Sequence, residues 1–552
     1  FILSLCLFLS TICRNLSAIY DGAYYLNCID SGKNLFLQTH FLYNFTGYLW
    51  VSLLQSLGFR ADSEIVVPVL NSIIGSLLLC LFYILLRTRA GLNRPSALIG
   101  TGLLAFSYAF WLNSVSTNAY MIALFFMVLV IYVLSGERLK TNHVYLAGVF
   151  SAMGVLYHLP NVLFVPVALV GLFMRRSLTD GFFRSASRYF STFIPIILVV
   201  QGIAIIATIH PHSLGEILNW ITSPGRSNVY WQPIALKTLL KSMYGFSISV
   251  IGSHWLFAIP SIKEIALKVL GDASFVKARL FIIRNFDPGL AICFLGLSAT
   301  FAVTVIFVFI SRLRGFGRIW NNSQGMIPMA CVWFAIYGIF FFFWDPSHVN
   351  FKLPQTLTWW LVFSALAGSG GKPAKMHDRS VIVATGLMVL LLLVINFFGS
   401  ISLLMTRNND YYYHRIAPLG EVISKNDLLI LERKENTLSY AIRYTKGQVL
   451  DLPRTFEKYK DTDLYVRAVA DKIGEILRNG GSVFIMKEAV DLEPQLAAQY
   501  GEGINSISKL WALYRSLWVR KQYGDTVVYV LQKDNLPDGV YSRPVELLEL
   551  ND

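Results

Sequence analysis

The chain has 552 residues, of which 55% are hydrophobic and only 14% are charged, and its mean hydropathy is +0.53. A soluble domain carries about 25% charged residues, so this composition excludes an ordinary cytosolic enzyme, a disordered chain and a small disulfide scaffold. The excess of Lys and Arg lies in residues 1–400, a pattern that indicates loops of a polytopic protein in a lipid bilayer and disfavours a nucleic-acid partner.

Eleven apolar segments approach the roughly 20 residues that a membrane-spanning helix needs. They are residues 1–13, 64–86, 95–113, 118–135, 143–158, 160–174, 189–209, 289–310, 326–344, 355–369 and 380–402. The chain opens with Phe1 inside the first segment, which we interpret as a truncated span and not as a signal anchor. Clusters of Lys and Arg follow the second, fourth, sixth and eighth segments and precede the last. The positive-inside rule then places all of these clusters on the cytoplasmic side.

This orientation places residues 14–63, 210–288 and 345–354 in outer loops, together with the segment that follows the last span. Residues 239–259 are also apolar enough to span, but a further span there would invert every later loop. We therefore interpret residues 239–259 as a re-entrant or interfacial element of an outer loop.

The composition changes after residue 402, where short segments rich in β-branched residues alternate with amphipathic ones. Strands are predicted at 427–432, 482–486 and 526–531, and helices at 463–478 and 492–500. The predicted fold is thus a polytopic α-helical membrane module over residues 1–402 and an extracytoplasmic α/β domain over residues 403–552. Because this domain has no glycine-rich phosphate loop and no nucleophile elbow, we interpret it as a structural or acceptor-facing cap.

The first outer loop carries the side chains that best fit acid–base chemistry. If residues 21–28 are helical, Asp21 and Tyr25 share one face, and His40 follows in the same loop. A carboxylate at the membrane surface could act as a general base for an acceptor hydroxyl or amine. Asp21 could equally be the N-cap of a loop helix, and the spacing leaves both interpretations open.

Two motifs of this loop, Asp21-x-x-Tyr24-Tyr25 and His40-x-x-Tyr43, resemble those of the GT-C glycosyltransferases. These are polytopic enzymes that use polyprenyl-phosphate-linked sugars, such as protein O-mannosyltransferases and lipid A aminoarabinose transferases. Later segments resemble further motifs of the same family in the same order, at residues 114–121, 154–161, 344–354 and 396–399. The resemblance covers roughly residues 15–450 and implies the GT-C fold.

The resemblance implies a catalytic role for one acidic residue of the first loop, and Asp21 is the position that matches. Asp30 is a second candidate, disfavoured because a Ser-Gly turn follows it. The family's second motif carries an acid before its tyrosine, whereas this chain has Asn118 two residues before Tyr120. An amide can bind a sugar hydroxyl but cannot take up a proton, which places a metal-dependent mechanism in doubt.

The residues predicted to bind substrate are Tyr24, Tyr25, His40, Tyr43, Asn118, Tyr120, Arg226, His348 and Lys352. Arg226 would hold a lipid phosphate, or would merely be solvated in an aromatic belt. Lys352 and His348 would grip a phosphate leaving group, unless Asp345 pairs with Lys352 structurally. We interpret His158, which lies between two short spans, as a histidine at a helix end, and a catalytic role is the alternative.

The sequence therefore predicts a membrane glycosyltransferase that moves a sugar from a polyprenyl-phosphate donor to an acceptor lipid, glycan or protein. The reaction is placed at the outer face of a bacterial cytoplasmic membrane, and no cofactor is expected, since a divalent metal has no support in the sequence. A catalytically inactive GT-C subunit of a larger complex, with protein partners, is the alternative that Asn118 favours. A secondary transporter is a third interpretation, weakened by the lack of internal repeats and of midplane charges.

Overall fold

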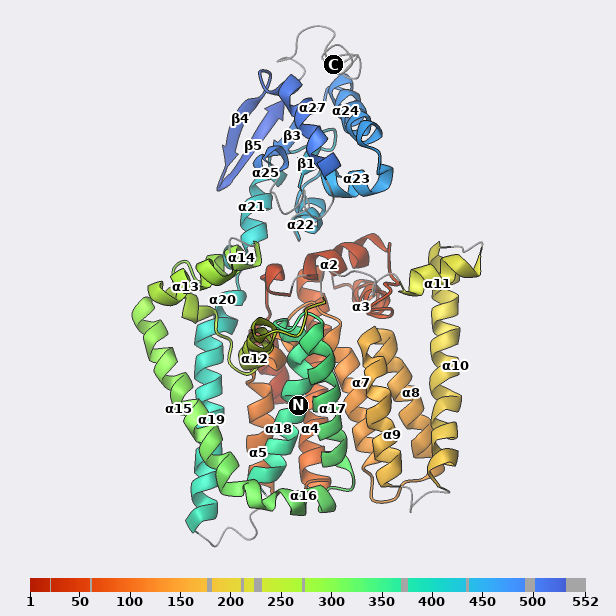
Figure 1. Cartoon of the computed structure of the whole chain (residues 1–552), viewed down its shortest axis with the longest axis vertical. Coiled ribbons are helices and arrows are strands. Elements are labelled where there is room, and N and C mark those ends of the chain that lie inside the picture. The colour runs from red at the N-terminus through yellow and green to blue at the C-terminus, as the bar shows by residue number, and fades with distance from the viewer. Residues whose placement is uncertain are drawn as a thin grey trace. The chain divides into compact units, whose positions relative to one another are not determined.

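The structure is a computed structural model that describes residues 1–19, 21–59, 62–175, 181–209, 213–222, 231–270, 274–368, 376–432, 436–491 and 502–532. The chain forms two compact units (Figure 1). Unit 1 comprises Phe1–Arg14, Cys28–Val269 and Ile283–Thr406, and unit 2 comprises Asn15–Asn27, Leu270–Ile282 and Arg407–Asp552. Each unit is described by itself.

Unit 1 is built from helices in its described residues. They include α1 (Ile2–Ser10), α3 (Tyr43–Ser56), α4 (Ser63–Thr88), α5 (Arg94–Ala105), α6 (Tyr108–Val115), α7 (Tyr120–Leu134), α8 (Thr141–Tyr157), η2 (Leu159–Phe164), α9 (Val165–Met174), α10 (Phe182–Ile209), α11 (Leu214–Thr222), α12 (Leu236–Val250), η5 (His254–Ala258), α13 (Pro260–Leu270), α15 (Pro288–Arg312), η6 (Leu313–Gly315), α16 (Phe316–Asn322), α17 (Met326–Phe343), η7 (Val349–Lys352), α18 (Leu353–Ala367), α19 (Met376–Asn396), η8 (Phe397–Ile401) and α20 (Ser402–Leu404). Helix α2 (Gly22–Ser31) contains the boundary between the units.

Several of these helices have the length and apolarity of membrane spans. Five qualify among the described residues: Ser63–Thr88, Phe182–Thr208, Pro288–Asn322, Met326–Phe343 and Arg379–Leu404. A sixth would be the pair α5 and α6, which is bent by 70°, and two shorter apolar helices cover Tyr120–Leu134 and Leu159–Met174. Membrane character is therefore evident, and the count of eleven spans stays a prediction.

The bend between α5 and α6 is held by side chains from distant segments. Asn396 Nδ2 donates to the carbonyl of Phe106 at 2.7 Å, and Trp360 Nε1 donates to Ser107 Oγ at 2.6 Å. Asn396 also accepts from Gly252 N at 2.8 Å, just beyond the end of α12. Because a helix break exposes backbone groups that lipid cannot satisfy, such partners make the irregular backbone tolerable. The interpretation of residues 239–259 as an interfacial element stays a prediction.

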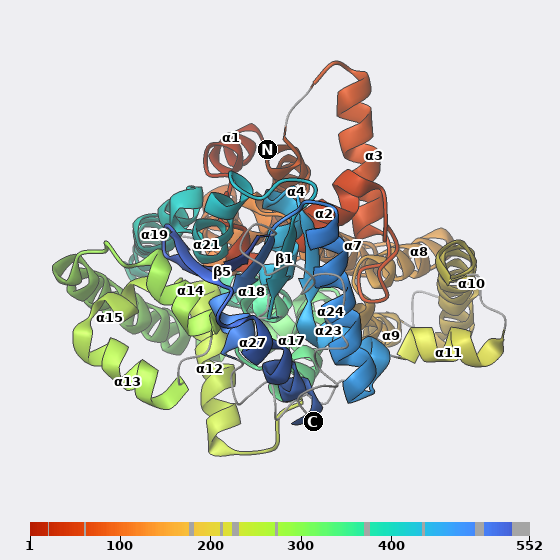
Figure 2. The ribbon, with the colours of Figure 1, turned by 90° about the horizontal axis from the view of Figure 1, so that it is seen from above.

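Helices α7, α8 and α10 lie side by side, as both ribbon views show (Figure 2). Gly148 on α8 explains the close approach of α10, since a Cβ there would lie 2.4 Å from the carbonyl oxygen of Tyr189. Small residues at such contacts are typical of helix pairs in membranes, where close backbone packing replaces the hydrophobic effect.

Unit 2 contains a five-stranded sheet with the order β2-β1-β3-β5-β4. The strands are β1 (Leu428–Leu431), β2 (Gln448–Asp451), β3 (Val483–Met486), β4 (Val519–Tyr523) and β5 (Thr526–Leu531). Strand β1 pairs in parallel with β2 and β3, whereas β5 is antiparallel to β3 and β4. Three of the strands, β1, β3 and β5, coincide with the segments predicted from sequence.

The helices of unit 2 follow local sequence signals. They are α14 (Ser274–Ile282), α21 (Tyr411–Gly420), α22 (Thr437–Tyr444), α23 (Leu452–Tyr459), α24 (Thr462–Arg478), α25 (Lys487–Val490) and α27 (Ile507–Tyr514), with short η1 (Leu16–Ile19), η9 (Arg407–Asn409) and η10 (Glu502–Ser506). Asp461 caps α24 by accepting from the amides of Asp463 and Leu464, and Gly480, with φ of 77°, ends it. The predicted helix at 492–500 lies outside the described residues.

Candidate active site

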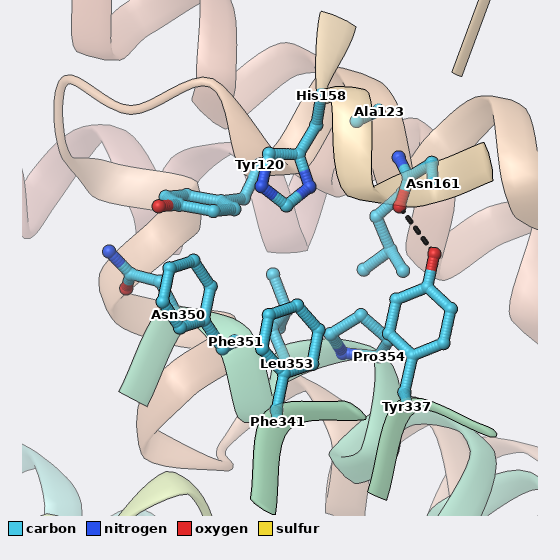
Figure 3. Close-up of a pocket in the computed structure, with 11 residues that line it drawn as sticks. Tyr120, Ala123, His158, Asn161, Tyr337, Phe341, Asn350, Phe351, Leu353 and Pro354 are labelled. Carbon is cyan, nitrogen blue, oxygen red and sulfur yellow. Dashed lines mark hydrogen bonds between the residues drawn. The ribbon is translucent and has the colours of Figure 1, made fainter. Parts of the chain in front are cut away.

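A pocket in unit 1 lies where four elements meet: the start of α7, the break between α8 and η2, the end of α17, and η7 with the start of α18 (Figure 3). Its lining residues are Tyr120, Ala123, Leu124, His158, Asn161, Tyr337, Phe341, Asn350, Phe351, Leu353 and Pro354. Most of the lining is aromatic or apolar, with a few polar groups, which is the usual make-up of a small-molecule site.

The break at His158 turns its imidazole into this pocket. His158 has an extended backbone, with φ of −155° and ψ of 104°, so α8 ends at Tyr157. Pro160 then begins a new helical segment, because its ring fixes φ and it has no N–H to continue α8. Asn161 Nδ2 donates to the carbonyl of Gly154 at 2.9 Å, which satisfies a carbonyl at the end of α8.

Around His158, aromatic rings from three other segments form one cluster. The ring of His40 stacks on His158 with centroids 5.1 Å apart and planes 7° apart. Tyr120 meets His158 edge-on at 4.9 Å, and Phe351 lies on it at 6.3 Å with planes 18° apart. Such offset and edge-on contacts add to the burial of these rings and fix their orientation.

His40 is neutral at pH 7. Its side chain is 7% exposed, and burial lowers its pKa to about 4 against the opposing effect of the Tyr157 carbonyl. Nδ1 lies 3.4 Å from that carbonyl oxygen, so Nδ1 carries the proton in this contact and Nε2 is the acceptor nitrogen of the ring. A neutral imidazole of this kind can accept a hydrogen bond from a sugar hydroxyl, but it cannot neutralise a phosphate.

The polar groups of the pocket wall are held by neighbouring side chains. The Tyr337 hydroxyl donates to Asn161 Oδ1 at 2.6 Å (Figure 3), and Asn113 Nδ2 donates to Asn350 Oδ1 at 3.1 Å. All four residues are buried. The wall is thus preorganised, because its amides and phenol are fixed before any ligand arrives.

The loop before α18 begins with a strained backbone conformation and contains aromatic rings that pack together. Asp345 adopts φ of 42°, which is unusual for a residue other than glycine, and its carbonyl accepts from His348 N at 3.2 Å. The His348 ring lies 4.5 Å from the ring of Phe351, a residue that lines the pocket. His348 therefore belongs to the same ring cluster as His158.

Lys352, at the end of η7, is a buried cation with neutral hydrogen-bond partners. It is 1% exposed, and Nζ donates to Ser242 Oγ at 3.2 Å and to the carbonyl of Phe341 at 3.4 Å. Burial lowers its pKa to about 8, while the charge of Asp345 opposes this shift. No described carboxylate forms an ion pair with it, so Asp345 acts only at longer range. With a pKa of about 8, the ammonium is mainly protonated at pH 7.

The first-loop residues Asp21, Tyr24 and Tyr25 belong to unit 2. Asp21 is exposed just before α2, and the Tyr25 hydroxyl donates to Asp21 Oδ2 at 3.4 Å, so the predicted shared face is present. Tyr25 is buried, whereas Tyr24 is 38% exposed. This geometry is compatible with a base and with a helix-starting residue, and the catalytic role of Asp21 stays a prediction.

Tyr43 and Asn118 are both buried in unit 1. Burial raises the pKa of Tyr43, which keeps its phenol protonated. Asn118 shapes the turn before α7: Nδ2 donates to the carbonyl of Asn113 at 2.8 Å, and Oδ1 accepts from Tyr120 N at 3.1 Å. Its amide is used by the backbone around it, and a sugar-binding role stays a prediction.

Comparisons with known proteins agree with this architecture. A family model described as "Protein O-mannosyl-transferase TMEM260 N-terminal domain" matches residues 42–180, which include Tyr120 and His158. The structure of ArnT from Cupriavidus metallidurans bound to undecaprenyl phosphate superposes with a TM-score of 0.55 at 10% identity, and the match covers 97% of each chain. The chain shares the fold of this ArnT.

Further comparisons are weaker. The apo structure of the same ArnT gives a TM-score of 0.45 at 11% identity over 97% of each chain. The arabinofuranosyltransferase AftD from Mycobacteria gives 0.37 at 15% identity, covering 89% of this chain and 35% of that one. No curated protein sequence matches the chain.

Within this fold, the structure brings together only part of the predicted set of site residues. His40, Tyr120 and His348 lie in one ring cluster, and Lys352 follows in the same loop as His348. Arg226 lies outside the described residues. His158 lies at the centre of the cluster, although its sequence position mainly indicated a histidine at a helix end. The sequence signal that could have identified it as a site residue is the His-Leu-Pro break itself.

The polar or aromatic pocket residues that were not predicted as site residues include Asn161, Tyr337, Asn350 and Phe351. Asn161, Asn350 and Phe351 lie in the segments 154–161 and 344–354 that resemble family motifs, but neither resemblance singled them out, and Tyr337 lies in the apolar helix α17. Among the described residues, no group of three or more His, Cys, Asp or Glu side chains could hold a metal ion. His40 and His158 stack face to face and do not converge on one point.

Proposed function

We propose that this chain is an integral membrane glycosyltransferase that moves a sugar from a polyprenyl-phosphate donor to an acceptor. The observation that carries the proposal is the fold-level match over nearly the whole chain to ArnT bound to undecaprenyl phosphate. The O-mannosyl-transferase family model over residues 42–180 supports the same reaction class. The site is placed on the outer face of a bacterial cytoplasmic membrane, as the charge pattern of the loops predicts.

The proposed chemistry is a substitution at the anomeric carbon of the donor sugar. Asp21 takes the proton from an acceptor hydroxyl or amine, the acceptor oxygen or nitrogen bonds to the anomeric carbon, and the bond to the polyprenyl phosphate oxygen breaks. The departing phosphate carries the negative charge that Lys352 is assigned to neutralise. The neutral His40 and the ring cluster around His158 provide hydrogen-bonding and apolar surface for the sugar and the first prenyl units.

Lys352 is the side chain that best supports a phosphate ligand. A cation that is 1% exposed, with two neutral partners, carries a desolvation cost that an arriving anion would offset. Ionisable residues kept at such positions in membrane proteins commonly mark a substrate site.

A second function is an inactive GT-C subunit of a larger membrane assembly. The observation that favours it is Asn118, where the family's motif carries an acid, with its amide engaged by Asn113 and Tyr120. In that case the pocket would persist as part of the fold, and the partner proteins would carry the chemistry.

Sugar transfer by the purified full-length chain in nanodiscs tests the proposal. The donors are a panel of polyprenyl-phosphate sugars, and the variants are Asp21→Asn and Asp30→Asn. Turnover that falls about 10²- to 10⁴-fold in Asp21→Asn alone supports the assigned base. A loss in Asp30→Asn alone would move the role to Asp30. The absence of turnover and of donor binding across the panel would favour the inactive subunit.

A further inference from the structure

Asp410 is a buried carboxylate of unit 2 that the proposed chemistry does not use. It is 1% exposed and precedes α21. Oδ1 accepts from the backbone amides of Tyr412 and Tyr413, both at 3.1 Å, which is the ordinary way in which an aspartate caps a helix. This cap occupies one of the two carboxylate oxygens.

The second oxygen of Asp410 binds the first loop of the chain. Oδ2 accepts from Leu16 N at 2.8 Å and from Ser17 N at 3.3 Å, although these residues are almost 400 positions away. It also accepts from the Tyr440 hydroxyl at 2.6 Å. A helix cap does not need these donors. The second oxygen therefore joins the first loop, α21 and α22 at one buried point.

The C-terminal end of the segment 15–27 is also bonded to α22. Asn27 Nδ2 donates at 2.8 Å to the carbonyl of Ser439, which precedes Tyr440 in α22. A further bond runs from Asn15 Nδ2 to the carbonyl of Asn409 at 2.8 Å. The segment 15–27 is thus attached to residues 409–440 on both sides of Asp21.

Most of this segment is buried, including Ile19 and Ala23 on either side of Asp21. Leu16 and Ser17 are buried where they meet Asp410, whereas Asp21 is exposed and Tyr24 is 38% exposed. A segment that is hydrogen-bonded at both ends and mostly buried between them, with its carboxylate exposed, is built to present that carboxylate in one place.

We propose that Asp410 is a positioning residue for Asp21, acting with α22, so that the C-terminal α/β unit takes part in sugar transfer and is more than a cap. The inference rests on the proposed function and assigns a structural cause to the placement of its base. A general base must lie within hydrogen-bond distance of the proton that it takes, and a displacement of about 1 Å can cost about 10²-fold in rate.

Amide hydrogen exchange on the full-length chain in nanodiscs measures the placement without any need for activity. Asp410→Asn is expected to raise the exchange rate of the peptide covering 15–27 by about tenfold or more, because amide donors lose a charged acceptor. Tyr440→Phe removes a single bond to the same oxygen and is expected to give a smaller increase. Its milder change keeps the test valid if Asp410→Asn does not fold.

Asp427→Asn is the matched control. Asp427 is also a buried carboxylate of unit 2 that accepts from two backbone amides, those of Ser424 at 2.6 Å and Ser482 at 2.7 Å. It is expected to leave exchange in the 15–27 peptide unchanged. An equal effect of Asp410→Asn and Asp427→Asn on that peptide would overturn the positioning role.

A double-mutant cycle separates positioning from general structural damage. Asp410→Asn is expected to lower kcat about 10- to 100-fold when Asp21 is present, and less than about twofold in the Asp21→Asn background, because residues that act as a unit are strongly non-additive. The same factor in both backgrounds would overturn the inference. If the wild type transfers no sugar, the proposed function fails alone, and exchange of the 15–27 peptide still supports or overturns the attachment to Asp410.

Discussion

Lys352 in unit 1 and Asp410 in unit 2 are both 1% exposed, yet their surroundings differ sharply. Asp410 accepts five hydrogen bonds, four from backbone amides and one from a phenol. Lys352 donates only two, at 3.2 and 3.4 Å, and both go to neutral oxygens. Both pKa values shift toward the neutral form because of burial, to about 6 for Asp410 and about 8 for Lys352.

The difference separates a charge that serves the fold from a charge that awaits a ligand. A buried charge is costly unless hydrogen bonds or an opposite charge compensate it. Asp410 has much of its compensation within unit 2, from four backbone amides and the Tyr440 hydroxyl. Lys352 has little compensation within unit 1, which is the state expected of a residue whose counter-charge arrives with the substrate.

The largest expected effect is a loss of stability when the Asp410 carboxylate is removed. Asp410→Ala removes the acceptor of five buried donors and is expected to lower the free energy of unfolding of unit 2 by about 3–5 kcal/mol. Thermal unfolding in detergent measures the change. Asp461→Ala is the control, because this exposed cap of α24 should cost only about 1 kcal/mol. Equal losses in the two variants would contradict the special role of Asp410.

Lys352→Met should have the opposite signature, with stability kept and function lost. Removing a poorly compensated buried charge is expected to leave the melting temperature unchanged or higher. Transfer from the polyprenyl-phosphate donor should fall about 10²-fold, which corresponds to about 2.7 kcal/mol.

The matched control for Lys352→Met is Lys241→Met, since Lys241 also donates to a neutral oxygen, Gln232 Oε1 at 3.1 Å, but is only half-buried. It should keep donor affinity. A melting temperature that falls in Lys352→Met while transfer persists would assign Lys352 to the fold.

The pH dependence of donor binding sharpens the same point. Because the folded pKa of Lys352 is about 8, the ammonium is lost above that pH, and donor affinity should fall up to about tenfold for each further pH unit. In Lys352→Met this dependence should be absent in equilibrium binding.

Stability should move in the opposite sense, since the folded pKa lies below the unfolded value of 10.5. The unfolded chain then binds more protons between these values, so the wild type loses stability as pH falls from 10.5 through 8. The advantage of Lys352→Met over wild type should grow across this window. A constant difference in melting temperature from pH 11 to pH 7 would contradict the assignment.

The sequence was sufficient to predict the helices and strands that local hydrophobic patterns indicate. The apolar runs mark α4, α10, α15, α17 and α19, and the β-branched segments mark β1, β3 and β5, because burial dictates these patterns directly. The strands β2 and β4 were not predicted. Each lies at an edge of the sheet, and β4 reads Val-Arg-Lys-Gln-Tyr, which carries no apolar signal.

The candidate site was only partly predictable, for a physical reason. Ionisable residues such as Lys352 are rare in an apolar sequence because burying them is energetically costly, so they can be recognised as candidate site residues from the sequence. The stacking of His40 on His158 and the bond from Tyr337 to Asn161 depend on contacts between helices distant in the chain, which no local pattern encodes. The same holds for Asp410, whose sequence context indicates only a helix cap.

Tyr337→Phe gives the smallest expected effect and tests whether pocket polar groups behave like Asp410 or like Lys352. Loss of the hydroxyl leaves Asn161 Oδ1 without its 2.6 Å donor in a buried site, which should cost about 1–2 kcal/mol of stability. Donor affinity should fall only about two- to threefold, because the hydroxyl is already committed to Asn161. Tyr157→Phe, which removes a 2.8 Å bond to Thr46 outside the pocket lining, should match the stability loss. A tenfold loss of donor affinity with unchanged stability would contradict this distinction. It would mean that a buried polar group with a hydrogen-bond partner inside the protein also binds the ligand, so that the presence of such partners does not distinguish structural from ligand-binding residues.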